Sequence, residues 1–193
     1  MVLLIYYFVV FIVAFVFRSL LVYRSTGINP LVLPSSEDAY GYVGRAFKVV
    51  IAGIAAVIIA LAIWPEAQVY FGRWNALGAR AVAFAGWALL IASLVWLLIA
   101  QAQMGASWRI GIDKRRTDLV QHGLFRLSRN PIFLAMRVNL LGLFLVFPSA
   151  VTAALLAAGE ILMQVQVRLE EQHLMNLHGR IYVDYQAKVR RWL

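Results

Sequence analysis

The sequence contains no cysteine, and this absence excludes several kinds of chemistry. A chain without cysteine has no disulfide framework, no thiol nucleophile and no cysteine-ligated metal site. It also lacks the Gly-x-Gly-x-x-Gly, Gly-x-x-x-x-Gly-Lys-Ser/Thr and Gly-x-Ser-x-Gly patterns of dinucleotide, P-loop and serine-hydrolase sites. Only three histidines are present, and the one Glu-x-x-His pair, Glu170 with His173, is half of what a di-iron bundle needs. We therefore expect no metal site.

Charged residues are also scarce, at 14% of the 193 residues, whereas 63% are hydrophobic. Soluble domains carry about a quarter charged and about half apolar residues. The composition therefore predicts a membrane protein, and the length predicts a single domain covering residues 1–193. The net charge of +9 does not indicate nucleic acid, because aromatic and basic residues do not interleave. The positive-inside bias of membrane proteins explains it better.

Five apolar runs are long enough to propose membrane spans. Each has 16 to 20 residues, near the lower part of the roughly 17–25 that a transmembrane helix needs. We predict an all-α integral membrane protein with five transmembrane helices and a C-terminal cytoplasmic, interfacial helical segment. The first three spans, within residues 1–103, form a scaffold with almost no polar residues at its centre. The predicted spans are Val2–Phe17, Phe47–Trp64, Ala81–Ala100, Pro131–Phe147 and Ala150–Val167.

The distribution of Lys and Arg predicts the orientation. With five spans, 15 of the 18 basic residues lie in the 18–48 loop, the 101–130 loop and the C-terminal tail. Only Arg73 and Arg80 lie on the opposite side, and Arg137 lies within a span. The positive-inside rule then places the N-terminus outside and the tail in the cytoplasm. In a prokaryote the membrane would be the inner membrane.

The fourth and fifth spans carry charge at membrane depth. Only Pro148 and Ser149 separate them, so they should form an antiparallel hairpin. Arg137 lies eleven residues before Pro148 and Glu160 twelve after it, so the two charges should meet as a pair. Such a pair can serve chemistry or only fix helix register.

A polar stripe follows one face of the fifth span towards the cytoplasm. Its residues are spaced i, i+4, i+8 and i+11, which keeps them on one helical face. A polar stripe in a membrane lines a wet cavity or meets partner groups, and both readings remain open. The stripe comprises Glu160, Gln164, Arg168 and Glu171, with Asn130 and Arg137 sharing a face of the fourth span.

The helix of the fifth span should continue to His178 and stop at Gly179, a typical residue just beyond a helix end. A second helix should follow, with an apolar face and a basic one, lying in the membrane interface. It either caps a pocket or anchors the chain to anionic lipid. The apolar face would comprise Ile181, Tyr182, Tyr185, Val189 and Trp192.

Three segments in this order resemble the isoprenylcysteine carboxyl methyltransferases and the related phospholipid methyltransferases. The resemblance covers about residues 104–193, and Gly105–Ile112 is similar to the segment that precedes the family signature. Asn130 stands where many members have His, and Phe125 and Phe133 replace Tyr. The matching segments are Gly123-Leu-Phe-Arg-Leu-Ser-Arg-Asn-Pro-Ile-Phe133, Glu170-Glu171 and Gly179-Arg-Ile-Tyr-Val-Asp-Tyr185.

The resemblance implies methyl transfer from S-adenosylmethionine to a lipophilic small molecule, a lipid or a prenylated acid, at the cytoplasmic membrane face. The implied cofactor-binding residues are Leu119, Val120, Gly123, Leu124, Phe125, Asn130, Pro131, Phe133, Glu170, Glu171, Tyr182 and Tyr185. The implied catalytic residues are Arg129 and Arg168, which would position an anionic acceptor, and Glu171 as a base. Arg137, Glu160 and Gln164 would bind substrate.

Two other classes remain open. The wider fold includes sterol reductases that use NADPH, and Lys114-Arg115-Arg116 could accept its 2′-phosphate. Alternatively, the polar stripe of a non-catalytic membrane protein would only specify packing. The sequence leaves the methyl acceptor and the oligomeric state open.

Overall fold

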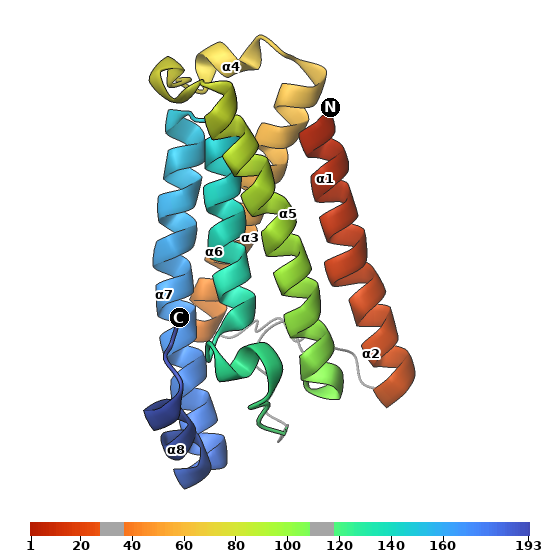
Figure 1. Cartoon of the computed structure of the whole chain (residues 1–193), viewed down its shortest axis with the longest axis vertical. Helices are drawn as coiled ribbons and strands as arrows, with labels where there is room; N and C mark the ends of the chain where they lie inside the picture. Colours follow the sequence, from red (N-terminus) through yellow and green to blue (C-terminus); the bar gives the residue numbers. More distant parts are fainter. Residues whose placement is uncertain (28–36, 109–117) are drawn as a thin grey trace.

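The computed structural model describes residues 1–27, 37–108 and 118–193, and it is helical throughout, with no β-strand in these ranges. Figure 1 shows the long helices side by side as a bundle. The elements are α1 (Val2–Val10), the π-helical segment η1 (Phe11–Phe17), α2 (Arg18–Thr26), α3 (Ala39–Ile63), α4 (Ala67–Tyr70), η2 (Asn75–Leu77), α5 (Arg80–Met104), η3 (Gly105–Ser107), η4 (Gly123–Arg126), α6 (Pro131–Val146), α7 (Ala150–His178) and α8 (Arg180–Lys188).

Among the described residues, four continuous helices are long and apolar enough to cross a membrane: Val2–Thr26, α3, α5 and α7. They correspond to four of the five predicted spans, although each extends beyond its apolar run. The helix of α3, for example, begins eight residues before Phe47, because the Asp38 side chain accepts a hydrogen bond from Gly41 N and caps it. The remaining predicted span, Pro131–Phe147, corresponds to α6, whose 16 residues extend about 24 Å against a hydrocarbon core of about 30 Å.

The first membrane helix is not α-helical throughout. Its middle, η1, has π-helical geometry, and Ala14 within it is fully buried. Gln101 on α5 donates its side-chain Nε2 to the Ala14 carbonyl at 3.0 Å. This bond gives a backbone carbonyl of the wide turn a partner inside the bundle, where no water is available.

Small residues bring α5, α6 and α7 close together, as the sequence of a membrane bundle predicts. A Cβ added at Gly86 on α5 would lie 2.7 Å from the Val146 nitrogen on α6. A Cβ at Gly159 on α7 would lie 2.3 Å from a methyl carbon of Leu140. A larger side chain at Gly86 would therefore push against the backbone of α6, whereas one at Gly159 would displace the end of the Leu140 side chain.

The hairpin of α6 and α7 forms as predicted. At its turn, Ser149 caps α7 and exchanges hydrogen bonds with Thr152 in a capping box. At its far end α7 stops at Gly179, which has a φ of +56°, as the sequence predicted. Here α8, η4 and the start of α6 gather at one end of the bundle, opposite to the N-terminus (Figure 1).

The predicted amphipathic helix is shorter than expected. Tyr182 and Tyr185 are buried, but Ile181 is 57% exposed and does not share their surface. After Lys188 the chain leaves the helix, so Trp192 lies on a non-helical tail and not on a helical face. The expected apolar face therefore holds only for the two tyrosines.

Candidate active site

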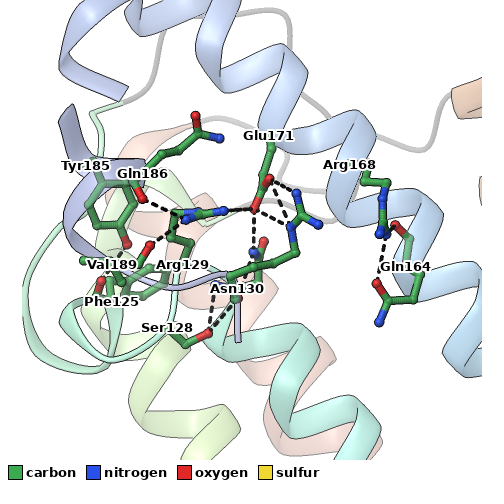
Figure 2. A network of polar contacts seen from close by, with 11 residues as sticks. Phe125, Ser128, Arg129, Asn130, Gln164, Arg168, Glu171, Tyr185, Gln186 and Val189 are labelled. Atoms are coloured by element: carbon green, nitrogen blue, oxygen red, sulfur yellow. Dashed lines mark hydrogen bonds and ion pairs between the residues drawn. The ribbon is translucent and has the colours of Figure 1, made fainter. Parts of the chain in front are cut away.

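At the α8 end of the bundle, two arginines converge on one buried carboxylate, that of Glu171. Glu171 has a side chain that is only 6% exposed; its Oε1 accepts from Arg129 Nη2 at 3.0 Å, and its Oε2 from Arg191 Nη2 at 2.8 Å. The Nε of each arginine and the Nδ2 of Asn130 donate to it as well, at 3.1 to 3.3 Å. Figure 2 shows how Arg129 and Asn130 meet Glu171, and we call Arg129, Asn130, Glu171 and Arg191 the carboxylate hub.

Arg129 also ties the hub to α8. Its Nη1 donates to the carbonyls of Gln186 at 3.2 Å and Val189 at 2.5 Å, which lie at the C-terminal end of that helix. Its backbone nitrogen donates to the Arg190 carbonyl at 2.9 Å. A cation is favourable at a helix C-terminus, so one guanidinium satisfies Glu171 and the end of α8 together.

Asn130, at the position where the resemblance led us to expect His, acts here as a hydrogen-bond donor. It is 8% exposed, and its Nδ2 donates to Glu171 Oε1 at 3.3 Å and to the Arg191 carbonyl at 3.2 Å. An amide does not titrate near neutral pH. In this chain, therefore, the position holds the hub and the tail together without moving a proton.

The two buried tyrosines of α8 fasten it to η4. Tyr185 donates its hydroxyl to the Phe125 carbonyl at 2.6 Å, and its ring lies 6.0 Å from that of Tyr182. Burial raises the pKa of Tyr185 to about 12, although the charge of Arg129 opposes the shift. Burial likewise raises the pKa of Tyr182, and the carboxylate of Glu171 raises it further. Both hydroxyls are therefore neutral over the working range of pH.

The segment before η4 is fixed by α5. Gly123 has a φ of +59°, and a Cβ there would lie 2.3 Å from the Gln103 amide. The Gln103 Oε1 accepts a hydrogen bond from Leu124 N at 2.7 Å. Only glycine fits this close approach, and the neighbouring Leu119 and Val120 are half-buried.

The predicted polar stripe forms a ladder of contacts on α7 and α6. Arg168 Nη1 donates to Gln164 Oε1 at 2.9 Å, and Gln164 Nε2 donates to Glu160 Oε1 at 2.8 Å. The predicted pair of Arg137 and Glu160 is confirmed, with Arg137 Nε 2.6 Å from Glu160 Oε2. The Arg137 guanidinium also lies 4.2 Å from the ring centre of Trp192. We call these five residues the polar ladder.

The three predicted catalytic residues, Arg129, Arg168 and Glu171, do not all lie together in the structure. Arg129 and Glu171 meet in the hub, whereas Arg168 bonds to Gln164 one side of it (Figure 2). Glu170, half-buried beside the hub, makes no hydrogen bond or ion pair within the part of the chain that the structure describes. Pro131 is buried as the first residue of α6, and Phe133 follows it half-buried.

Sequence reasoning missed several residues of this region. Arg191 was assigned only to the basic C-terminal tail, Gln103 to the loop after the third span, and Ser128, which donates to the Arg191 carbonyl at 3.1 Å, to the signature segment. The roles of Arg191 and Ser128 depend on a tail that folds back over α6, and that of Gln103 on the return of η4 to the end of α5; no local pattern indicates either. The Lys114-Arg115-Arg116 cluster lies outside the described residues.

The comparisons with known proteins bear on this same region. No curated protein and no solved structure matches the chain. A family model described as phospholipid methyltransferase matches residues 81–181, which is just over half of the chain. The match takes in nearly all of α5 and the whole of η3, η4, α6 and α7, and it includes Arg129, Asn130 and Glu171 of the hub. The chain therefore belongs to the phospholipid methyltransferase family.

Proposed function

We propose that the protein transfers a methyl group from S-adenosylmethionine to a lipophilic acceptor at the cytoplasmic face of a membrane. The observation that carries the proposal is the coincidence of the family match with the hub. The membrane helices support a lipophilic acceptor, because a lipid can reach the site sideways from the bilayer. The proposal covers a prenylated carboxylate, a lipid amine or another hydrophobic molecule.

The residues present fit the proposed cofactor in one clear respect. Glu170 is a carboxylate without a protein partner among the described residues, and the cofactor carries an ammonium group and ribose hydroxyls that need an acceptor. The backbone around Leu119–Leu124, fixed on Gln103, would hold its polar groups. When bound, the cofactor supplies a methyl group on a sulfonium, which calls for alignment more than for a strong base.

The aromatic residues of the proposed site differ in what they can offer. Phe125, Tyr182 and Tyr185 are all buried, and a hydrogen bond joins η4 to α8 among them. We assign to these three the support of the cofactor-binding surface. Phe133 is half-buried and is the ring we assign to contact with adenine or the sulfonium.

We assign positioning roles to Arg129 and Glu171. Both oxygens of Glu171 accept hydrogen bonds from guanidinium groups, so its lone pairs are engaged and a proton would have to displace an arginine. Arg168 is exposed at the end of the polar ladder nearest the hub and would attract an anionic acceptor group. Arg137, Glu160 and Gln164 would line its approach along α7.

We also propose that the hub end of the bundle is cytoplasmic, on the basis of the basic residues gathered there. The cysteine-free chain makes this direct to test, because single cysteines can be introduced without removing any. Gln121→Cys at the hub end should react with a membrane-impermeant maleimide only after cell lysis. Asn75→Cys, at the other end of the bundle, should react in intact cells. The reverse pattern would invert the topology.

Calorimetric titration of the purified protein with S-adenosylhomocysteine tests the reaction class. Wild type should bind, and Glu170→Gln should bind about 10- to 150-fold more weakly, the range expected for a hydrogen bond to a charged group. Gln172→Ala, an exposed neighbour, should bind like wild type. An absence of binding by wild type at millimolar ligand would overturn the proposed class, and unchanged binding by Glu170→Gln would overturn only the assignment of Glu170.

A further inference from the structure

A cavity of about 420 Å³ lies within the membrane bundle, away from the hub. Its walls come from the first membrane helix, α3, α5, α6 and α7, and they are almost entirely apolar. No residue of the carboxylate hub or of the polar ladder lines it. Cavities of about 300–1,000 Å³ are typical of small-molecule binding sites. Phe15, Ile54, Leu97 and Met163 are representative of its lining.

The cavity has one polar patch, formed by Tyr7, Ser93 and Asn139. Tyr7 donates its hydroxyl to Asn139 Oδ1 at 2.9 Å. Asn139 Nδ2 donates to the Tyr6 hydroxyl at 2.8 Å and to Ser93 Oγ at 3.1 Å. Tyr6 and Ser93 in turn both donate to the Leu90 carbonyl, at 2.6 and 2.8 Å.

This network has used every donor that it contains. Both amide hydrogens of Asn139 and all three hydroxyl hydrogens already point at protein acceptors. Lone pairs remain on Asn139 Oδ1 and on the Tyr7 hydroxyl oxygen, because each oxygen can accept more than it does here. A ligand in the cavity is therefore offered acceptors only, and the group that matches them is a donor such as a hydroxyl.

The exposed large side chains of the cavity lining lie on the first membrane helix and α3, which indicates an opening between these two helices. Phe8 and Phe11 on one side are 64% and 57% exposed, and Ile51 and Ile59 on the other are 55% and 48% exposed. Exposed apolar side chains on membrane-spanning helices face lipid tails. A molecule that enters by this route comes from the bilayer and must be largely apolar.

We propose that this cavity binds a lipophilic molecule that carries a hydroxyl group, with the hydroxyl donating to Asn139 Oδ1 or Tyr7 and the apolar body filling the space between α3, α5 and α7. The inference does not depend on methyl transfer. The family match begins at residue 81, so the walls contributed by the first membrane helix and α3 lie outside it. The site therefore combines helices inside the family match with two that lie outside it.

The test uses photoaffinity labelling of the purified full-length protein in lipid nanodiscs, without any methyl donor. The probe is a diazirine-bearing hexadecanol, and the competitors are 1-hexadecanol, 2-hexadecanone and hexadecane. In wild type the alcohol should compete about two- to tenfold better than the ketone or the alkane, which is the value of one neutral hydrogen bond. Equal competition by all three would overturn the proposal.

Two adjacent alanines supply a matched pair of variants. Ala55 lines the cavity and Ala56 does not, although both lie on the exposed surface of α3. Ala55→Trp should abolish specific labelling, whereas Ala56→Trp should leave it unchanged. Wild-type labelling of Ala55→Trp would place the probe elsewhere and overturn the site. Since both variants add the same side chain at adjacent positions, Ala56→Trp controls for folding and lipid contact.

A third variant tests the hydrogen-bond logic itself. Asn139→Leu removes the acceptor of the Tyr7 hydroxyl and so frees that hydroxyl as a donor. In this variant the Tyr7 hydroxyl can donate to the ketone oxygen, so 2-hexadecanone should compete better than hexadecane. In wild type it should compete no better than hexadecane. A ketone that still competes no better than hexadecane would show that Tyr7 does not face the bound ligand's polar group.

Discussion

The sharpest stability prediction concerns Glu171→Gln, which removes the charge of the carboxylate hub but keeps the shape of the side chain. Glu171 and Arg129 are 6% and 10% exposed, so this is a buried pair, whereas Arg191 is 34% exposed and adds less. Loss of one partner of a buried ion pair costs about 3–5 kcal/mol. Because the remaining amide oxygen still accepts one hydrogen bond, we expect about 3 kcal/mol. In a chain of this length that lowers the Tm by about 6–12 °C.

Thermal unfolding in detergent, followed by tryptophan fluorescence, measures the effect. Glu170→Gln is the matched control, because it makes the same change one residue away at a carboxylate with no described partner. It should unfold within about 2 °C of wild type, even though it is the variant expected to lose cofactor affinity. If Glu171→Gln unfolds together with Glu170→Gln, the hub does not stabilise the fold and our reasoning about it is refuted.

Three further predictions follow from the same contacts. Arg191→Ala removes the contact that holds the tail to Glu171 and should speed trypsin cleavage after Lys188. Arg190→Ala, whose exposed side chain has no described partner, should not change the rate of this cleavage. Mass spectrometry of the released tail distinguishes the two variants. Arg137→Met alone should lower the Tm, since a lone membrane charge costs about 2.5–3.5 kcal/mol, and Arg137→Met with Glu160→Met should recover it. The Tyr185 hydroxyl stabilises the fold below about pH 10 and loses this effect as the pH rises through its raised pKa of about 12. Between about pH 10 and pH 12, therefore, the Tm of Tyr185→Phe should fall less than the Tm of wild type.

The elements that the sequence predicted well are those in which short-range pattern and membrane physics agree. Arg137 and Glu160 could be paired in advance, because a two-residue turn fixes the register of an antiparallel hairpin and a lone charge in lipid is unfavourable. The end of α7 at Gly179 was also predictable from the sequence, because the residue just beyond a helix end often has a positive φ, which favours glycine. The helical class and the family followed from composition and from the signature around Asn130.

The contacts that escaped prediction all join distant parts of the chain. Arg191 reaches Glu171 only because the tail turns back after Lys188, and Gln103 meets Gly123 only because η4 returns to the end of α5. Asn139 lies on α6 beside Arg137, and the sequence analysis assigned a role to Arg137 only. Its partners on α1 could not be inferred, because nothing in an apolar run specifies which neighbouring helix it faces.

The π-helical segment η1 sets the rotational phase between the two ends of the first membrane helix. On one side of it Tyr6 and Tyr7 bond to the cavity network, and on the other Arg18 Nη2 donates to the Gly105 carbonyl at 2.7 Å. Each residue of an α-helix advances the direction of the side chains by about 100°. Deletion of one residue from Phe11–Phe17 would therefore swing one anchorage away from its partner. In this run of seven apolar side chains, the number of residues constrains the sequence more tightly than their identity does.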